Sequence, residues 1–550
     1  MKSIFNRILF AGAAAAICFS CTNLDETLYS DISSETHEMT ETELAATIAP
    51  VYSSLRDVCW GWFGSFDLND MSSDVWGVPN RIGIGWGDLY IPMHKHQFNS
   101  EMGFFTVSWY NNYAGVNACN KILANEAITA NETVAAQIRT FRVLYYYNLF
   151  SAFRNIPLDT QYEHEDGWLP EQSKPEDTFD WMVSELLEVA DLCPKSAELG
   201  KMNYYAAHML LAKLYLNHNA WFKDDSDKSW YEKALDEINI VISGPFSLSN
   251  TYSANFVESL AGNKEIIFGI PFEEKYAGGN YYANLWHHTA VRSRWGFSGW
   301  ATNGGIVFPQ FLDIYEEGDK RFDATWTGGV QYKADGTPIM YDGAPAEYKR
   351  EIRSIDNPGC YPFEGYALVK YQILSGPKGT SYDDVPYYRL SEAYYIKAEC
   401  LLRLNKDLNT AAELVTAVRM RAFDNPEDAA VTAEELMGGS VYDYGHRENT
   451  AKINEPDNWI ITHEGGADIE LGGLLDEYAR EFVAEGHRRD CLIRFNIKGT
   501  NMNVYCGKSW FCKDAEKDRH SDLFPIPQDA LNGNPKLKQN PGFVYVVDNK

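Results

Sequence analysis

The chain has 550 residues, 45% of them hydrophobic and 23% charged, which is enough apolar material for a large buried core. Its formal net charge of −29 argues against nucleic-acid binding, which requires a basic face, and against docking on an anionic membrane surface. Aromatic residues make up 14% of the chain, more than a core needs, so we expect some of them to form a surface on which a ligand stacks.

The first 20 residues have the composition of an export signal. Lys2 and Arg7 precede a short apolar run at 8–19, which is too short for a stable membrane span. A serine and then Cys21 follow, an arrangement that resembles a bacterial lipoprotein cleavage site. We expect Cys21 to be the lipidated N-terminus, with an ordinary signal peptide cut nearby as the alternative. Residues 21–41 are polar and acidic and predict a flexible leader.

Helical periodicity dominates from residue 42 to residue 243. The stretch 135–158 has apolar residues at steps of three and four and a second apolar flank, which predicts a central helix buried on several sides and ended by Pro157. Further helices are predicted at 42–57, 109–127, 175–192, 203–220 and 229–242. Their short connections and packing residues resemble tetratricopeptide helix pairs with an irregular period.

Two segments, 59–105 and 244–383, interrupt this pattern. The first is dominated by glycine, tryptophan, aspartate and asparagine and has no helical period, so we expect a long loop region that carries function. The second consists of short β-like runs separated by glycine-rich loops. Short strands are predicted in the second segment at 265–270 and 366–371, and helices return at 387–404, 408–421 and 474–484.

The motifs of common enzyme chemistries do not occur in the sequence. It has no GxSxG elbow, and the glycines at 83, 85 and 87 lack the spacing of a dinucleotide site. The run from His487 to Asp490 resembles a kinase catalytic loop only superficially and predicts structural ion pairs near the end of a helix. We assign no catalytic residue, and a glycosidase carboxylate pair remains a remote alternative.

Two groups of metal-ligand residue types were considered. His94 and His96 alternate as on a strand, but no third ligand is evident, so a surface strand is preferred to a metal site. Asp224, Asp225 and Asp227 lack the glycine and glutamate of an EF-hand loop and predict a solvated turn. No metal or cofactor is assigned, and the sequence leaves open whether calcium is bound.

The cysteines after Cys21 include no CxxC pair. Buried thiols are expected within helical patterns, at Cys119, Cys193, Cys400 and Cys491. Cys506 and Cys512 flank a short loop, and the sequence leaves open whether they form a disulfide.

Two clusters of aromatic and polar residues indicate a binding site. The first contains Trp60, Trp62, Trp76 and Trp86 with Asn69, Asp70, Asn80 and Arg81. The second contains Tyr281, Tyr282, Trp286, Trp295 and Trp300 with Arg292 and Asn303. A sugar offers apolar C–H faces and a rim of hydroxyls, which suit flat rings edged by amide, carboxylate or guanidinium groups. The clusters therefore predict a glycan site; the alternative is that the tryptophans pin the loops to the core.

Several segments resemble the signatures of the SusD/RagB family of surface lipoproteins, namely Arg139–Leu158, Asn203–Asn217, Asn263–Ile270, Asp384–Glu399, Leu475–Phe495 and Leu523–Phe543. The resemblance implies a mainly α-helical, SusD-like fold on four tetratricopeptide-like helix pairs, with a loop-rich second half that carries short strands. We expect one unit over 42–550, with a helical part to 243 and a loop-rich part from 244.

The resemblance also implies a role that is not enzymatic. Such proteins are lipid-anchored at the outer surface of the outer membrane, where they bind oligosaccharides and deliver them to a SusC-type TonB-dependent transporter, as in starch utilisation. Asp25 and Glu26 are similar to the acidic signal that directs these lipoproteins to the surface. The expected partners are a glycan, a SusC-like transporter and the membrane lipid; a peptide-capturing member of the family is the alternative.

By motif position the resemblance assigns ligand contacts to Trp76, Asn80 and Tyr282. The turn at 302–304 is similar to the family pattern. Where an aromatic residue may follow that turn in the family, this chain has Gly305, which suggests a glycan other than starch. Trp295 or Trp300 would substitute. The full predicted ligand-binding set is Trp76, Asn80, Arg81, Tyr282, Trp286, Trp295, Trp300, Asn69 and Asp70.

Overall fold

The computed structural model describes residues 39–59, 63–81, 87–278, 280, 286–296, 301–357, 359–376 and 381–544. Contacts within the chain divide it into two units, residues 1–46 and residues 47–550. In the first unit, the start of α2 (Glu41–Cys59) has a reciprocal cap. Thr40 N donates to Glu43 Oε2 at 2.9 Å, and Glu43 N donates to Thr40 Oγ1 at 3.3 Å. All elements from α3 onward lie in the second unit.

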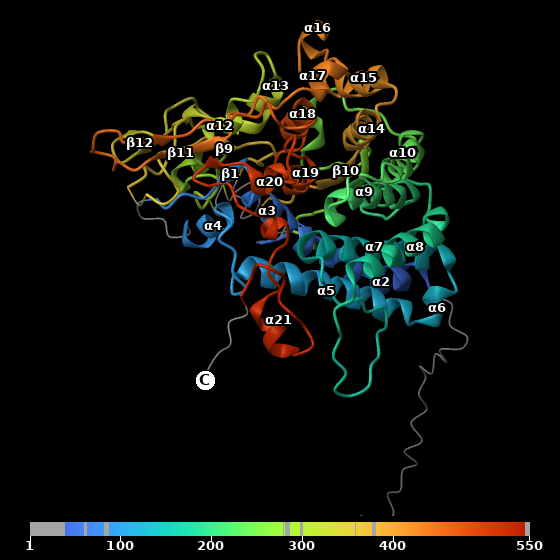
Figure 1. Cartoon of the computed structure of the whole chain (residues 1–550). Coiled ribbons are helices and arrows are strands. Elements are labelled where there is room, and N and C mark those ends of the chain that lie inside the picture. Colours follow the sequence, from blue (N-terminus) through green and yellow to red (C-terminus); the bar gives the residue numbers. More distant parts are fainter. Residues whose placement is uncertain are drawn as a thin grey trace, which may run out of the picture. The chain divides into compact units, whose positions relative to one another are not determined.

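Helices that follow one another in the sequence pack side by side in the second unit (Figure 1). The series runs through α5 (Gly103–Leu123), α7 (Glu132–Phe153), α8 (Pro175–Val189), α9 (Tyr204–Phe222), α10 (Ser229–Ile242), α14 (Leu390–Leu404) and α15 (Leu408–Arg419). Helix α14 packs on α10 although about 150 residues separate them in the chain, so the loop-rich segment is inserted into a continuous helical array. The predicted helices of this series are confirmed, with small differences at their ends.

Helix α7 is the central helix that its sequence predicts. It begins where the Asn131 side chain accepts a hydrogen bond from Val134 N at 3.2 Å, and it ends at Arg154, whose φ is 58°. A Cβ atom on Gly115 of α5 would lie 2.5 Å from the Tyr145 ring, so the two helices can approach this closely only because residue 115 is glycine. The Tyr145 hydroxyl donates to Val51 O at 2.5 Å and thereby joins α7 to α2.

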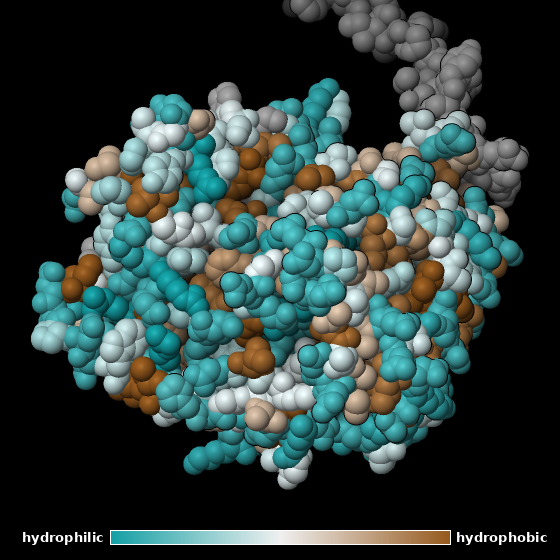
Figure 2. Space-filling model, turned by 90° about the horizontal axis from the view of Figure 1, so that it is seen from above, coloured by the Kyte–Doolittle hydropathy of each residue, from teal (hydrophilic) through white to brown (hydrophobic). Residues whose placement is uncertain are grey.

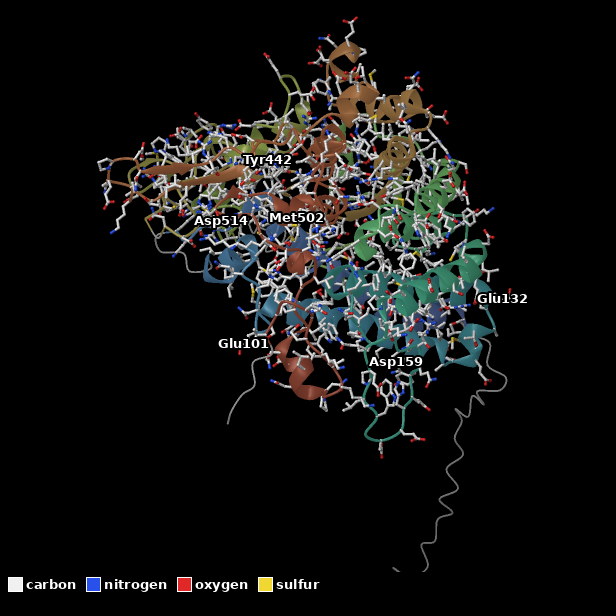
Figure 3. All side chains as sticks on the ribbon, viewed as in Figure 1. Glu101, Glu132, Asp159, Tyr442, Met502 and Asp514 are labelled. Atoms are coloured by element: carbon white, nitrogen blue, oxygen red, sulfur yellow. The ribbon has the colours of Figure 1, made fainter. Side chains whose placement is uncertain are left out.

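The chain leaves the helical layer after α7 in a loop that begins near Asp159 (Figure 3). The Tyr146 hydroxyl holds the start of this loop, because it donates to Asp159 O at 2.7 Å and accepts from Asp159 N at 2.8 Å. Both backbone groups of the loop residue are therefore paired with one buried side chain.

The strands are short and form small sheets in the loop-rich half. Their pairs are β1 (Trp76–Gly77) with β3 (Ile306–Val307), β2 (Ile266–Ile270) with β10 (Val385–Arg389), β4 (Trp326–Thr327) with β9 (Ala367–Leu368), β5 (Gly329–Val330) with β8 (Glu347–Tyr348), β6 (Met340–Tyr341) with β7 (Ala344–Pro345), and β11 (Gly445–Asn449) with both β12 (Trp459–Ile461) and β13 (Trp510–Phe511). The strand predicted at 265–270 is confirmed, and the one at 366–371 is reduced to β9.

Short helices fill much of the remainder: α3 (Ser65–Met71), α4 (Gly87–His94), α6 (Glu126–Thr129), α12 (Pro309–Leu312), α13 (Lys320–Thr325), α16 (Pro426–Ala429), α17 (Ala433–Met437), α18 (Gly472–Phe482), α19 (Arg488–Arg494), α20 (Val504–Gly507) and α21 (Gln528–Gly533). Single 3₁₀ turns are η1 (Ala190–Leu192), η2 (Tyr252–Asn255), η3 (Thr289–Arg294) and η4 (His520–Asp522). Helices α3, α4 and the start of α5 correct the prediction of a loop without helices over 59–105.

The surface strand predicted around His94 and His96 is wrong. His94 ends α4, is fully buried, and packs against the Phe308 ring at 4.6 Å. His96 follows in a left-handed conformation with φ of 55°, and its ring nitrogens contact Ser72 O at 2.8 Å and the Glu516 carboxylate. Burial lowers the pKa of both imidazoles, and both side chains lie in the protein interior.

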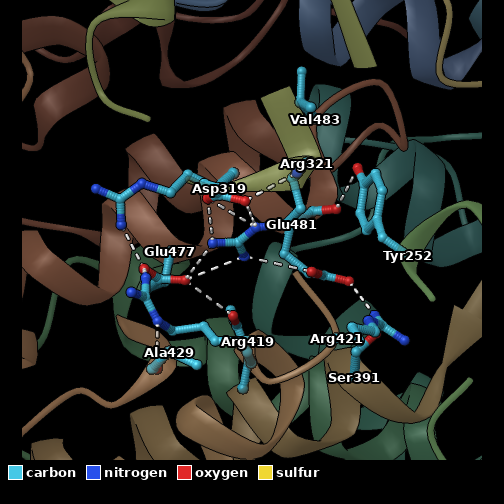
Figure 4. A network of polar contacts seen from close by, with 12 residues as sticks. Tyr252, Asp319, Arg321, Ser391, Arg419, Arg421, Ala429, Glu477, Glu481 and Val483 are labelled. Atoms are coloured by element: carbon cyan, nitrogen blue, oxygen red, sulfur yellow. Dashed lines mark hydrogen bonds and ion pairs between the residues drawn. The ribbon is translucent and has the colours of Figure 1, made fainter. Parts of the chain in front are cut away.

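A network of buried ion pairs joins the helical array to the loop-rich half (Figure 4). Arg321 of α13 is 0% exposed and pairs with Asp319 at 2.8 Å and with Glu477 of α18 at 3.3 Å. Arg419 of α15 also pairs with Glu477. Burial alone raises the pKa of Glu477, but the surrounding arginines outweigh it and hold the pKa at about 2. The carboxylate therefore stays charged and fixes the mutual position of three helices.

The eight described cysteines are buried free thiols, so Cys506 and Cys512 are not bonded to each other. Cys506 Sγ contacts Asp522 Oδ1 at 3.4 Å, and Cys512 Sγ contacts the Ser354 hydroxyl at 3.8 Å. Among the described helices, none has the length and apolar character needed to cross a bilayer. The face drawn in Figure 2 is mostly hydrophilic, with hydrophobic residues in small separate groups.

Candidate functional site

Three tryptophans form a buried tryptophan cluster where β1 meets β3. The Trp76 ring lies 4.8 Å from the Trp286 ring and 6.2 Å from the Trp326 ring, and the three residues are 1%, 2% and 3% exposed. Strand β1 is placed by its pairing with β3 and by the bond from Phe308 N to Val75 O at 2.9 Å. The ring faces of Trp76 are therefore covered by protein, and the cluster forms the base of the site.

The Trp286 ring explains why position 305 holds a glycine and not the aromatic residue that may follow this turn in the family. A Cβ atom there would lie 1.6 Å from Cζ3 of Trp286, inside the ring's van der Waals radius. The indole of Trp286 occupies the space that a side chain at 305 would need. An aromatic residue is thus supplied from another part of the chain.

Arg81 connects the end of the first loop segment to the turn before Gly305. Its Nη1 donates to Asn303 O at 2.5 Å and to Gly304 O at 2.8 Å, and its Nε and Nη2 have no hydrogen-bond partner among the described residues. Burial lowers its pKa to about 10. Asn303 has a φ of 55°, and its side chain donates to Pro362 O at 2.8 Å, so the turn is held from two sides. Asn80, beside Arg81, is partly exposed.

Four partly exposed rings pack on a different buried core and form the aromatic group of the candidate site: Trp295, Tyr341, Tyr361 and Tyr366. They pack on buried side chains that include Tyr348 and Phe363. The edge of His287 contacts the Trp295 ring at 4.7 Å, and burial together with the nearby Arg294 lowers the pKa of His287 to about 3. The sequence interpretation missed the three tyrosines, because they are scattered over 341–366 with no motif.

Asn69 and Asp70 do not join this group in the structure. Both lie on α3, where Asn69 Nδ2 donates to Gly486 O at 3.0 Å and Asp70 Oδ2 accepts from Gly486 N at 3.2 Å. Burial raises the pKa of Asp70 to about 8. Asn69 instead borders a separate polar cleft, which Lys213, His487 and Asp490 also line.

Other residues of the predicted site fall outside the described residues, namely Tyr282 and Trp300 of the ligand-binding set and Trp60, Trp62, Trp86 and Tyr281 of the two clusters. Cys21 also falls outside them. The described residues of the predicted ligand-binding set therefore lie in two places. Asn69 and Asp70 lie on α3, and the others lie in and around the region of the buried tryptophan cluster.

The metal candidates of the sequence were also located. Asp224 and Asp227 accept hydrogen bonds from Ser226 and Ser229 in the exposed turn between α9 and α10, as predicted for a solvated turn. In the described chain, Glu516, Asp518 and His520 bring three ligand-type atoms within 4.8 Å of one another. Glu516 already pairs with His96, and Asp518 pairs with His520 at 2.5 Å. These pairs account for the cluster without an ion.

Comparison with known proteins identifies the fold. The starch-binding protein SusD of Bacteroides thetaiotaomicron is 24% identical over 531 residues, which cover 88% of this chain and 83% of that protein. The SusD-like protein P25 of Formosa agariphila is 23% identical over 95% of this chain and 96% of its own length. Among solved structures, surface glycan-binding protein A of Bacteroides uniformis aligns with a TM-score of 0.66 and 19% identity over 91% of this chain and 99% of that chain.

These structures confirm the expected fold, which is mainly helical and SusD-like with short strands in the second half. The SusD family consists of binding proteins that are not catalytic, in agreement with the expectation that this chain is not an enzyme. The model of the SusD family matches residues 250–543, more than half of the chain, and this protein belongs to that family.

Proposed function

We propose that this protein binds a glycan at the cell surface and delivers oligosaccharides to a SusC-type TonB-dependent transporter in the outer membrane. The observation on which the proposal rests is the aromatic group of Trp295, Tyr341, Tyr361 and Tyr366, whose partly exposed rings pack on a buried core that includes Tyr348 and Phe363. Exposed rings on a rigid base offer flat apolar surfaces to the C–H faces of sugars.

Partly exposed polar side chains support the same function. Arg294 lies beside the Trp295 ring and Asn80 adjoins Arg81, and both can form directional hydrogen bonds to hydroxyl groups. Similar proteins support it further, since one solved relative is named a laminarin-binding SusD-like protein and another is a complex with laminarihexaose.

The test is binding of the mature chain to a panel of polysaccharides, by affinity gel electrophoresis and calorimetry. We expect at least one glycan to bind, and Trp295→Ala to weaken that binding by about 1–3 kcal/mol, the range for stacking on an aromatic side chain. Trp168→Ala is the matched control, because Trp168 is 42% exposed and stacks on His164 in the loop after α7. Binding of peptides and of no glycan would refute the proposal.

The location and partner need separate tests. We propose that Cys21 carries the lipid anchor, so a Cys21→Ala variant should lose its membrane attachment and keep its glycan affinity. We also propose that the chain assembles with a SusC-like transporter. Purification of the tagged protein from outer membranes should recover such a transporter in constant ratio, and recovery of the tagged chain alone would count against the partnership.

A further inference from the structure

One arginine of the candidate site lies against the most accessible tryptophan described there. Arg294 ends η3 and Trp295 follows directly; the guanidinium carbon lies 5.0 Å from the centre of the indole ring. A cation at this distance from an aromatic face or edge is held close to any ligand that stacks on the ring.

The position of the guanidinium is fixed by neutral groups. Its Nη1 donates to Thr327 Oγ1 at 3.1 Å and to Gln331 Oε1 at 2.7 Å. Gln331 is 2% exposed, and its own amide donates to Gly328 O at 3.2 Å and to Gly329 O at 3.1 Å. The amide is therefore locked, and it orients the guanidinium without neutralising the positive charge.

Arg447 also lies against a tryptophan but, unlike Arg294, forms an ion pair. Arg447 lies over the Trp459 ring at 5.3 Å, much as Arg294 lies by Trp295, but its Nη2 pairs with Glu351 at 2.7 Å. No carboxylate among the described residues forms an ion pair with Arg294. Arg294 is thus positioned by neutral groups in a chain with 77 acidic and 48 basic residues, and it keeps its positive charge available to a ligand.

Arg81 extends the same pattern deeper in the site. It is 2% exposed, its Nη1 donates to two backbone carbonyls, and no described residue accepts a hydrogen bond from its Nε or Nη2. The carboxylate of Glu364 lies near Arg81 but pairs with Arg353 at 3.2 Å, and no described carboxylate forms an ion pair with Arg81. The region around both arginines is therefore electrostatically suited to a negative group.

We propose that the glycan taken by this site is anionic, with a carboxylate or sulfate that pairs with Arg294 while its sugar ring stacks on Trp295. This inference rests on the proposed glycan-binding function and names the ligand class. A guanidinium binds both anions through paired N–H···O contacts, so the shared feature is a cluster of anionic oxygens beside an apolar sugar face. The net charge of −29 repels polyanions in general, so such binding requires a local site.

The experiment compares charged polymers with neutral counterparts of the same backbone. Polygalacturonate is paired with its carboxyl-reduced form, and dextran sulfate is paired with dextran; each is titrated into the full mature chain. We expect one charged polymer to bind at least about tenfold more tightly than its neutral counterpart, the smallest effect of one charge-assisted hydrogen bond. Which pair shows the difference distinguishes a carboxylate from a sulfate.

Variants separate the site from general electrostatics. Arg294→Gln should reduce the affinity for the charged polymer about tenfold or more, Arg294→Lys should recover part of it, and Arg447→Gln should leave it unchanged. Equal melting temperatures of the Arg294 variants and the wild type show that the fold is intact.

Different results would refute the anionic ligand class and the glycan-binding function. Binding of neutral polymers only, or equal binding of each pair, would overturn the anionic class and leave the glycan-binding function standing. An affinity for the charged polymer that Arg294→Gln does not change would also overturn it. Binding of no polymer in a broad panel would overturn both.

Discussion

The ion pair between Asp74 and Arg488 should be among the most costly single contacts to remove. Arg488 Nε and Nη2 each donate to one carboxylate oxygen of Asp74 at 2.7 Å, and the side chains are 2% and 0% exposed. The Tyr444 hydroxyl donates to the same carboxylate at 3.0 Å. Asp74 stands two residues before Trp76, so this pair ties the base of the candidate site to α19.

Replacement of Arg488 by Met leaves the Asp74 carboxylate buried with only one side-chain donor. Two charge-assisted hydrogen bonds are lost, at about 1.5–3 kcal/mol each, and an uncompensated buried charge costs about 3–5 kcal/mol in comparable cases. We therefore expect Arg488→Met to lower the free energy of unfolding by about 3–5 kcal/mol. The double variant Asp74→Asn/Arg488→Met should cost clearly less than the sum of the two single variants, because the second change removes the stranded charge.

The assay is urea denaturation followed by tryptophan fluorescence, with circular dichroism as a second probe of two-state behaviour. Arg350→Met is the matched control, because Arg350 pairs with Asp313 at the surface, where an ion pair contributes at most about 1 kcal/mol. A loss below about 1 kcal/mol in Arg488→Met, or strict additivity in the double variant, would refute the reasoning.

Three further predictions concern the base of the site and α3. Trp76→Ala should cost about 3–5 kcal/mol of unfolding free energy in the same assay, since its ring is 1% exposed. Gly305→Ala should displace the Trp286 ring, which near-ultraviolet circular dichroism would detect, and cost about 1–3 kcal/mol through overpacking. Burial raises the pKa of Asp70 from 3.8 to about 8, so between these pH values the folded state keeps a proton that the unfolded state releases. The free energy of unfolding of the wild type therefore falls as the pH rises from about 4 to about 8. The stability of Asp70→Asn relative to the wild type should therefore increase from pH 5 to pH 8, and a constant difference would contradict this.

The long helices were predictable from the sequence because each has an apolar stripe with a helical period and a clear end. Helix α7 shows this best: its stripe predicts burial, and the boundary at Phe153 lies near Pro157 as expected. Helix α3 was missed because two of its buried residues, Asp67 and Asp70, are carboxylates, which a hydrophobic period counts as exposed. The alternation of His94 and His96 suggested a strand, whereas the positive φ of His96 turns the chain at a helix end.

The site was predictable only in its general region. The sequence places Trp76 and Trp286 in different aromatic clusters, and the structure brings them into contact across more than 200 residues of chain. Which ring is buried and which is exposed depends on such distant contacts, so periodicity could not separate Trp76 from Trp295. The tyrosines at 341, 361 and 366 become candidates for the site only because the structure packs them on one core that includes Tyr348.

The position of Trp286 determines where a ligand can stack. The Trp286 ring fills the space over Gly305 and packs against the Trp76 ring. Both tryptophan rings are buried, so neither offers an open face on which a sugar could stack. Trp295 is a partly exposed ring of the candidate site, and the charged group fixed beside that ring is Arg294. A glycan that stacks in this region therefore meets a guanidinium before it meets the buried tryptophans. For this reason changes at Arg294 should alter which glycans bind, whereas changes at Trp76 should first lower the stability of the fold.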